Sequence, residues 1–210
     1  KSGRLDSATQ QKFLREAGDA ARLLLSNAKK VAQLVLNFKQ LAVDRIMEPR
    51  RRFDLLAHLE QTIEELQPGL NDANVLVSID AEPGVAIDGY PGAVAQVITN
   101  LAINSMQHAF EPEIGGRVSI RAGVRADNQV CIEYTDDGCG IDSTVQSRVF
   151  EPFFSTRRVL GGSGLGLYIA HQIITRQLHG SIAFESGADD GVRFTVLFPS
   201  VASQLATFTR

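Results

Sequence analysis

The sequence has few cysteines, no tryptophan and no long apolar run. Its two cysteines, Cys131 and Cys139, are too few for a disulfide framework, so a reducing cytoplasm is the expected location. No stretch approaches the roughly 20 uninterrupted apolar residues of a membrane span. No signal peptide is visible either. We expect a fragment without membrane contact of its own, and any sensor or membrane segment before Lys1 would be unseen.

An excess of basic residues is also missing. The 210 residues carry 21 Lys and Arg against 24 Asp and Glu, a net charge of −3, so no nucleic-acid partner is indicated. Histidine is scarce as well, and the four present all follow residue 50 (His58, His108, His171 and His179). The length allows one ordinary domain with a smaller appendage.

The appendage is predicted to be one long helix. Residues 8 to about 46 contain no proline and a single glycine, and apolar residues recur there at alternating four- and three-residue steps. A second apolar stripe widens this face beyond a two-stranded seam, as a helical bundle requires. The helix cannot bury this face alone, so it needs a partner helix from an upstream segment or a second subunit. Pro49 ends it, which predicts domains at 1–49 and 50–210.

The remainder is predicted to alternate between strands and helices. Helices are expected at Leu56–Leu66, at Ala93–Phe110 and after the glycines near residue 164. Strands are expected at Phe53–Leu55, Val75–Ile79, Val85–Ile87, Val118–Val124, Val130–Thr135, Ser181–Ser186 and Val192–Phe198. The fold class is therefore α+β, a two-layer α/β sandwich with helices on one face of a mixed sheet, preceded by the long bundle helix.

Polar residues recur at every fourth position in the second of these helices. Gln96, Asn100, Asn104 and His108 share one helical face, among neighbours that are largely apolar. Buried amides are costly unless they are hydrogen-bonded. The stripe therefore predicts contact with a ligand, a metal or ordered water, the alternative being a face open to solvent.

Two glycine clusters bracket an aromatic and basic segment. The first is Asp136-Asp-Gly138-Cys-Gly140-Ile141 and the second is Gly161-Gly162-Ser163-Gly164-Leu165-Gly166-Leu167. Glycine allows close approach of backbone to a ligand, and a glycine-rich turn that opens a helix presents N–H groups to phosphate. We interpret the clusters as parts of a nucleotide site.

Together these motifs resemble those of bacterial sensor histidine kinases. Asn100-x-x-x-Asn104, Asp136-x-Gly138-x-Gly140, Phe150-Glu-Pro-Phe-Phe154 and Gly162-x-Gly164-x-Gly166 are similar, in order and spacing, to the N, first glycine, F and second glycine boxes. The resemblance covers roughly residues 50–199. It implies the Bergerat ATP-binding fold, ATP and Mg²⁺ as cofactors, and a response regulator receiver domain as partner.

The resemblance also implies roles for individual residues. Asp136 would accept a hydrogen bond from the adenine amino group, and Asn104 would ligate Mg²⁺. Arg157, on an expected mobile lid with Arg158, would offset charge on the transferring phosphoryl group. The other residues expected to contact nucleotide are Asn100, Gln107, His108, Gly138, Gly140, Ile141, Phe150, Gly162, Ser163, Gly164, Leu165 and Gly166. His108 has a second interpretation, as a cap of the helix face, and Phe150 is expected to anchor the lid rather than to stack on the base.

In the same family the place of residues 1–49 belongs to a dimerisation hairpin whose first helix carries the phosphoacceptor histidine. No histidine occurs there, so this helix resembles the second of the hairpin and predicts a homodimer through the N-terminal helix. The acceptor is expected upstream of Lys1, and this fragment is not expected to phosphorylate itself.

Asn100 separates the enzymatic alternatives. Relatives of the fold that hydrolyse ATP carry Glu four residues before the metal-binding Asn, where it activates water. An amide is a poor general base. We therefore expect phosphotransfer to histidine, with a degenerate nucleotide-binding module or an ATPase as the alternatives.

Overall fold

The computed structural model describes residues 11–25, 28, 49–111, 113–156, 163–187 and 190–200. It divides into two compact units, Lys1–Arg45 and Ile46–Arg210. In the first unit, residues 11–25 are helical. Several of their apolar side chains are exposed, among them Phe13, Leu14 and Leu24. The rest of the long helix predicted for residues 8 to about 46, apart from residue 28, lies outside the described residues.

The second unit is built on a five-stranded sheet with strand order β2-β4-β5-β7-β6. These strands are β2 (Val75–Ala81), β4 (Gly116–Val124), β5 (Gln129–Asp136), β7 (Val192–Pro199) and β6 (Ser181–Ser186). β2 and β4 are parallel, and the other neighbours are antiparallel. The sheet is therefore mixed, as predicted.

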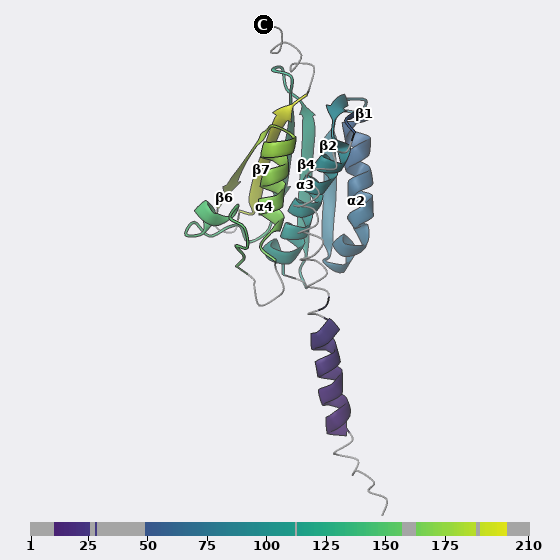
Figure 1. Ribbon diagram of the computed structural model, residues 1–210, viewed down its shortest axis with the longest axis vertical. Coiled ribbons are helices and arrows are strands. Elements are labelled where there is room, and N and C mark those ends of the chain that lie inside the picture. Colours follow the sequence, from purple (N-terminus) through teal and green to yellow (C-terminus); the bar gives the residue numbers. More distant parts are fainter. Residues whose placement is uncertain are drawn as a thin grey trace, which may run out of the picture. The chain divides into compact units, whose positions relative to one another are not determined.

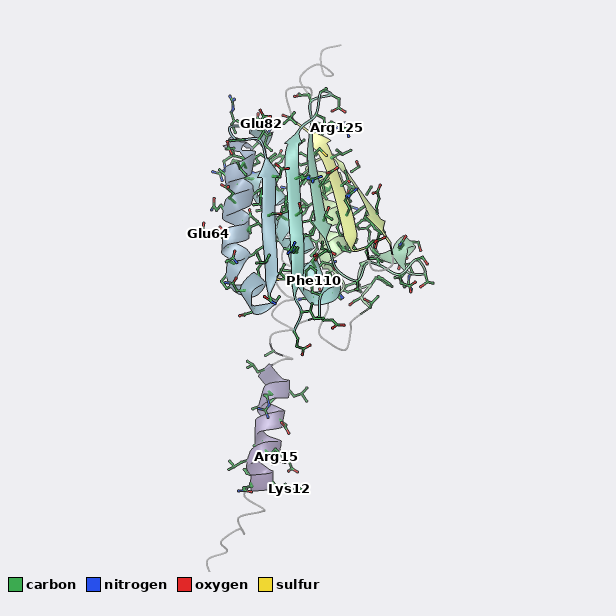
Figure 2. The ribbon with its side chains drawn as sticks, turned by 180° about the vertical axis from the view of Figure 1, so that it is seen from behind. Lys12, Arg15, Glu64, Glu82, Phe110 and Arg125 are labelled. Atoms are coloured by element: carbon green, nitrogen blue, oxygen red, sulfur yellow. The ribbon has the colours of Figure 1, made fainter. Side chains whose placement is uncertain are left out.

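Helices cover one face of this sheet, as Figure 1 shows. They are α2 (Leu55–Asp72), α3 (Pro91–Asn104) and α4 (Gly166–Gln172), and π turns η1 (Ser105–Ala109) and η4 (Ile173–Gln177) extend the last two. Figure 2 shows the opposite face, with strand side chains projecting toward the viewer. The predicted two-layer α/β sandwich is confirmed.

The core lies between these two layers. Ile98 and Leu101 on α3 are fully buried, and Ile132 and Phe194 supply the facing side chains from β5 and β7. Alternate residues of β5 are buried along its whole length, so the strand places one set of side chains under the helices. Burying each large apolar side chain contributes about 1.5–3 kcal/mol, which fixes α3 against the centre of the sheet.

A second, small sheet joins β1 (Arg51–Asp54) to β3 (Ala86–Gly89). The strands expected on either side of the Glu82-Pro83-Gly84 turn therefore belong to different sheets. Leu55, expected in a strand, begins α2 instead, because the Asp54 side chain accepts a hydrogen bond from the Ala57 N–H at 2.9 Å and caps the helix.

Two helices differ in extent from their predictions. α2 continues past Pro68 to Asp72, since the fully buried Leu70 packs its last turn into the core. The helix expected at Ala93–Phe110 begins at Pro91, and its α-helical part ends at Asn104, where η1 takes over. Within the described residues, no helix is both long and apolar enough to cross a membrane.

Candidate functional site

Asp136 is the last residue of β5 and is only 2% exposed. Its Oδ2 accepts a hydrogen bond from Ser105 Oγ at 2.7 Å, and its Oδ1 accepts one from the Gly138 N–H at 3.2 Å. Burial raises the pKa of the Asp136 carboxyl, while these hydrogen bonds act in the opposite direction. Both carboxylate oxygens are thus held by the protein at one end of the sheet.

Ser105 and Tyr134 belong to this arrangement, although the sequence analysis did not select them. Tyr134 Oη donates to Ser105 Oγ at 3.1 Å, and both side chains are completely buried. Burial also raises the pKa of Tyr134. The alternation of β5 would have placed Tyr134 on the same inward face as Asp136, where a buried tyrosine hydroxyl needs a partner.

The first glycine motif follows β5 and packs against the end of η1. A Cβ added to Gly138 would lie 2.6 Å from the Ala109 carbonyl oxygen, and the same oxygen accepts a hydrogen bond from the Cys139 N–H at 3.0 Å. Gly140 has φ +73°, a conformation that favours glycine. The Ile141 N–H donates to Ser186 Oγ at 2.7 Å. These glycines were expected to make room for a base, which stays a prediction; the contacts in the structure show that they make room for the protein backbone.

Asn100 lies on α3 and is 8% exposed. Its Nδ2 is buried and has no hydrogen-bond partner among the described residues. Four residues on, Asn104 is half-buried at the end of α3. His108 is half-buried and Gln107 is exposed, both in η1. The polar stripe thus contains one buried donor without a partner, which suits an acceptor brought by a ligand.

The second glycine motif leads into α4. A Cβ on Gly166 would lie 3.8 Å from the Asn100 carbonyl oxygen, so the start of α4 lies against α3. Gly164 has φ +67°. The helix begins at Gly166, not with the predicted turn at Gly164–Leu167. The Leu165 N–H is 3.3 Å from Ser163 Oγ and donates to it. Arg157, Arg158 and Gly162 lie outside the described residues.

The aromatic motif packs against α4 and β6. The ring of Phe150 lies 5.2 Å from that of His171 and 5.9 Å from that of Phe184, centroid to centroid. A Cβ added to Gly164 would lie 2.7 Å from the Phe154 carbonyl oxygen. Phe150 therefore packs against the core, and its expected role as an anchor of a lid stays a prediction.

The motifs that are separate in sequence thus adjoin one another. Ser105 joins the asparagine helix to Asp136, Ala109 adjoins Gly138, Gly166 adjoins Asn100, and Gly164 adjoins the aromatic motif. The sequence model of the histidine kinase-, DNA gyrase B-, and HSP90-like ATPases matches residues 89–202, more than half of the chain. The chain belongs to this family.

Sporulation kinase B of Bacillus subtilis is one relative of this chain, and the two sequences are 28% identical over 186 residues. That alignment covers 89% of this chain and 42% of the relative, so the chain spans less than half of the relative's length. The relatives confirm the resemblance to sensor histidine kinases.

Two solved histidine kinase structures share the fold. Full-length ShkA in complex with AMPPNP has a TM-score of 0.66 at 25% identity, covering 93% of this chain and 40% of that one. ThkA in complex with the response regulator protein TrrA has a TM-score of 0.64 at 19% identity, covering 95% and 54%.

The donor groups of this family member suit a magnesium ion that is bound jointly by the protein and by the phosphates of a nucleotide. The described residues hold no group of three or more His, Cys, Asp or Glu suited to a metal ion. Mg²⁺ keeps several waters and takes further oxygens from substrate phosphates, so the protein needs to supply few oxygens of its own. Asn104, half-buried beside the Ser105–Asp136 pair, is the candidate for such an oxygen.

Proposed function

We propose that this chain is the ATP-binding catalytic part of a sensor histidine kinase. It would transfer the γ-phosphoryl group of Mg²⁺-ATP to a histidine of a dimerisation segment, for relay to an aspartate of a response regulator in the cytoplasm. The observation that carries the proposal is that both glycine motifs lie against the same helical segment, α3 with η1. Asp136 accepts a hydrogen bond from Ser105, the residue after Asn104, and Gly166 lies against Asn100. The AMPPNP complex of ShkA and the response regulator complex of ThkA support it by similarity.

Asp136 would select the base. Its carboxylate accepts hydrogen bonds, and adenine presents an amino group where guanine presents a carbonyl. A carboxylate held on both oxygens at a strand end cannot turn away from the base without breaking a hydrogen bond. The family member would therefore bind adenine nucleotides in preference to guanine nucleotides.

Residues of α3, η1 and the second glycine motif would hold the phosphates. The unpartnered Nδ2 of Asn100 is a donor suited to a phosphate oxygen. Gln107 and His108 lie further along the same segment. Backbone N–H groups of the glycine motif, from Gly162 to Gly166, would add further donors. Magnesium, when bound through Asn104, would offset charge on the β- and γ-phosphates.

The rate of the chemical step would depend on how the acceptor histidine is positioned relative to the γ-phosphoryl group. The bond from the γ-phosphorus to the bridging oxygen breaks as a bond to an imidazole nitrogen forms, and ADP leaves. Arg157 would offset the negative charge on the phosphoryl group during its transfer. Asn100 supplies no general base for water, so a positioned histidine is the better nucleophile. Positioning contributes about 7–11 kcal/mol to lowering such a barrier in favourable cases.

Calorimetric titration with AMPPNP and Mg²⁺ tests the nucleotide site. Wild type should bind at micromolar concentration, Asp136→Asn should lose binding, and Asn104→Asp should alter its dependence on Mg²⁺. Absence of binding by wild type would overturn the proposal. Transfer is tested in the full-length protein with γ-labelled ATP, where the label should be acid-labile and alkali-stable. Release of inorganic phosphate with no labelled histidine would favour an ATPase.

A further inference from the structure

Three side chains form a continuous hydrogen-bonded chain under the helices. Tyr134 Oη is 3.1 Å from Ser105 Oγ, and Ser105 Oγ is 2.7 Å from Asp136 Oδ2. Tyr134 and Ser105 have no exposed surface, and Asp136 has 2%. Two of these residues lie on β5 and one begins η1, so the chain joins the sheet to the helical layer.

The protons in this chain can point in one direction only. An ionised carboxylate accepts hydrogen bonds and donates none, so Ser105 must donate to Asp136. The Ser105 oxygen is then free to accept, and Tyr134 must donate to it. Each hydroxyl therefore donates its proton in the direction of Asp136.

The Asp136 carboxylate is held by this chain and by two backbone N–H groups, those of Gly138 and Val192. The strands on either side place Val118 and Val192 opposite it in the register, and of these two only the Val192 backbone is a hydrogen-bond partner of the carboxylate. Its other oxygen, Oδ1, accepts from the Gly138 N–H. Asp137, the neighbouring charge, opposes ionisation of Asp136. Ser105 thus fixes one carboxylate oxygen while the glycine motif fixes the other.

We propose that Ser105 and Tyr134 are positioning residues that orient Asp136 toward the 6-amino group of adenine and thereby set the base selectivity of the nucleotide site. The inference rests on the proposed function and deepens it. It also connects the two ends of the ligand, because Ser105 directly follows Asn104, the candidate magnesium ligand. A shift of this turn moves the base acceptor and the phosphate-side amide together.

The test compares two ligands that differ only in the 6-amino group, ADP and purine riboside 5′-diphosphate. The key variant is Ser105→Ala with Tyr134→Phe, which removes both hydroxyls at once, so that no buried hydroxyl is left unpaired and the change at Asp136 is the loss of the bond to its Oδ2. Its affinity for ADP should fall about tenfold or more, while its affinity for the purine analogue stays within about threefold of wild type. Tyr134→Phe alone is the matched control, because it keeps the bond from Ser105 to Asp136 and should retain most of the preference for ADP.

Several outcomes separate this inference from the proposed function. If wild type binds ADP and the double variant keeps the full preference for it, the inference is wrong and the function stands. If the double variant loses both ligands equally, the two hydroxyls are merely structural and the inference also falls. Binding of neither ligand by wild type would overturn the proposed function and the inference with it. If the double variant does not fold, the ratio of the affinities for ADP and the purine analogue is measured for Ser105→Ala alone.

Discussion

At the scale of single residues, Asp136 makes stability depend on pH in an unusual direction. Burial raises the pKa of its carboxyl in the folded state above the ordinary value of an aspartate. The folded protein therefore holds the proton more tightly than the unfolded chain does. The resulting stabilisation is complete below the unfolded pKa and is lost as pH rises through the folded pKa.

This effect predicts the behaviour of Asp136→Asn. The free energy of unfolding of wild type minus that of the variant should decrease as pH rises from about 4 toward neutrality. Urea denaturation at a series of pH values measures it. The exposed Asp142 is the matched control, because hydrogen bonds from Thr144 lower the pKa of its carboxyl. For Asp142→Asn the corresponding difference should stay nearly constant over this range and decrease only as pH falls below about 4. A constant difference for Asp136→Asn would contradict the prediction.

Asn100 carries the second prediction at this scale. Replacing it with Glu would supply a general base at a position where the amide has none. Release of inorganic phosphate from ATP should then rise by about tenfold or more. Asn100→Gln is the control, since it keeps an amide and should not raise hydrolysis. The assay is steady-state phosphate release at saturating ATP. A wild-type rate that already equals that of the Glu variant would refute the role given to Asn100.

At the scale of elements, the contact between η1 and the first glycine motif depends on the missing side chain of Gly138. A Cβ there would press on the Ala109 carbonyl. Gly138→Ala should therefore lower the free energy of unfolding by about 1–3 kcal/mol and weaken nucleotide binding. Gly123→Ala on β4 is the matched control, since an added Cβ there meets nothing within 4 Å. Urea denaturation of both variants measures the difference. Equal stability of the two would contradict the prediction.

The elements that the sequence predicted well are those with a strict local pattern. The alternation in β5 and β7 and the asparagine spacing of α3 follow from side chains that must face the core or the site. The ends of α2 depended on tertiary contacts, a cap by Asp54 and burial of Leu70, which no local pattern contains.

The sequence predicted the motifs of the candidate site, but it did not predict the hydrogen bonds that connect them. Asp136 and Asn100 were selected because their polarity stands out among apolar neighbours. Ser105 was missed because a small hydroxyl on a helix has no distinctive spacing. Its role depends on the π turn that begins there, and on Tyr134 from a strand distant in sequence.

At the scale of the whole molecule, the described helix of residues 11–25 leaves large apolar side chains exposed. Phe13, Leu14 and Leu24 are 66%, 68% and 69% exposed, and an isolated helix of this length is marginal in water. Burying each such side chain contributes about 1.5–3 kcal/mol, so a partner helix would be strongly favoured. We propose that the partner is a second copy of this chain.

A symmetric dimer predicts a sharp effect of one added charge. A substitution at the interface occurs twice, once in each copy, so Leu24→Glu would place two carboxylates in an apolar contact. Sedimentation velocity should show wild type as a dimer and the variant as a monomer at the same micromolar concentration. AMPPNP affinity should be unchanged, because the residues of the proposed nucleotide site all belong to the unit Ile46–Arg210.

Gln11→Glu is the control for the added charge, since Gln11 is an exposed polar residue of the same helix and its replacement removes no apolar surface. It should remain dimeric. A monomeric wild type would show that this helix takes its partner from elsewhere, and a dimeric Leu24→Glu would show that Leu24 lies outside the contact. Loss of nucleotide binding together with dissociation would mean that the helix also contributes to nucleotide binding.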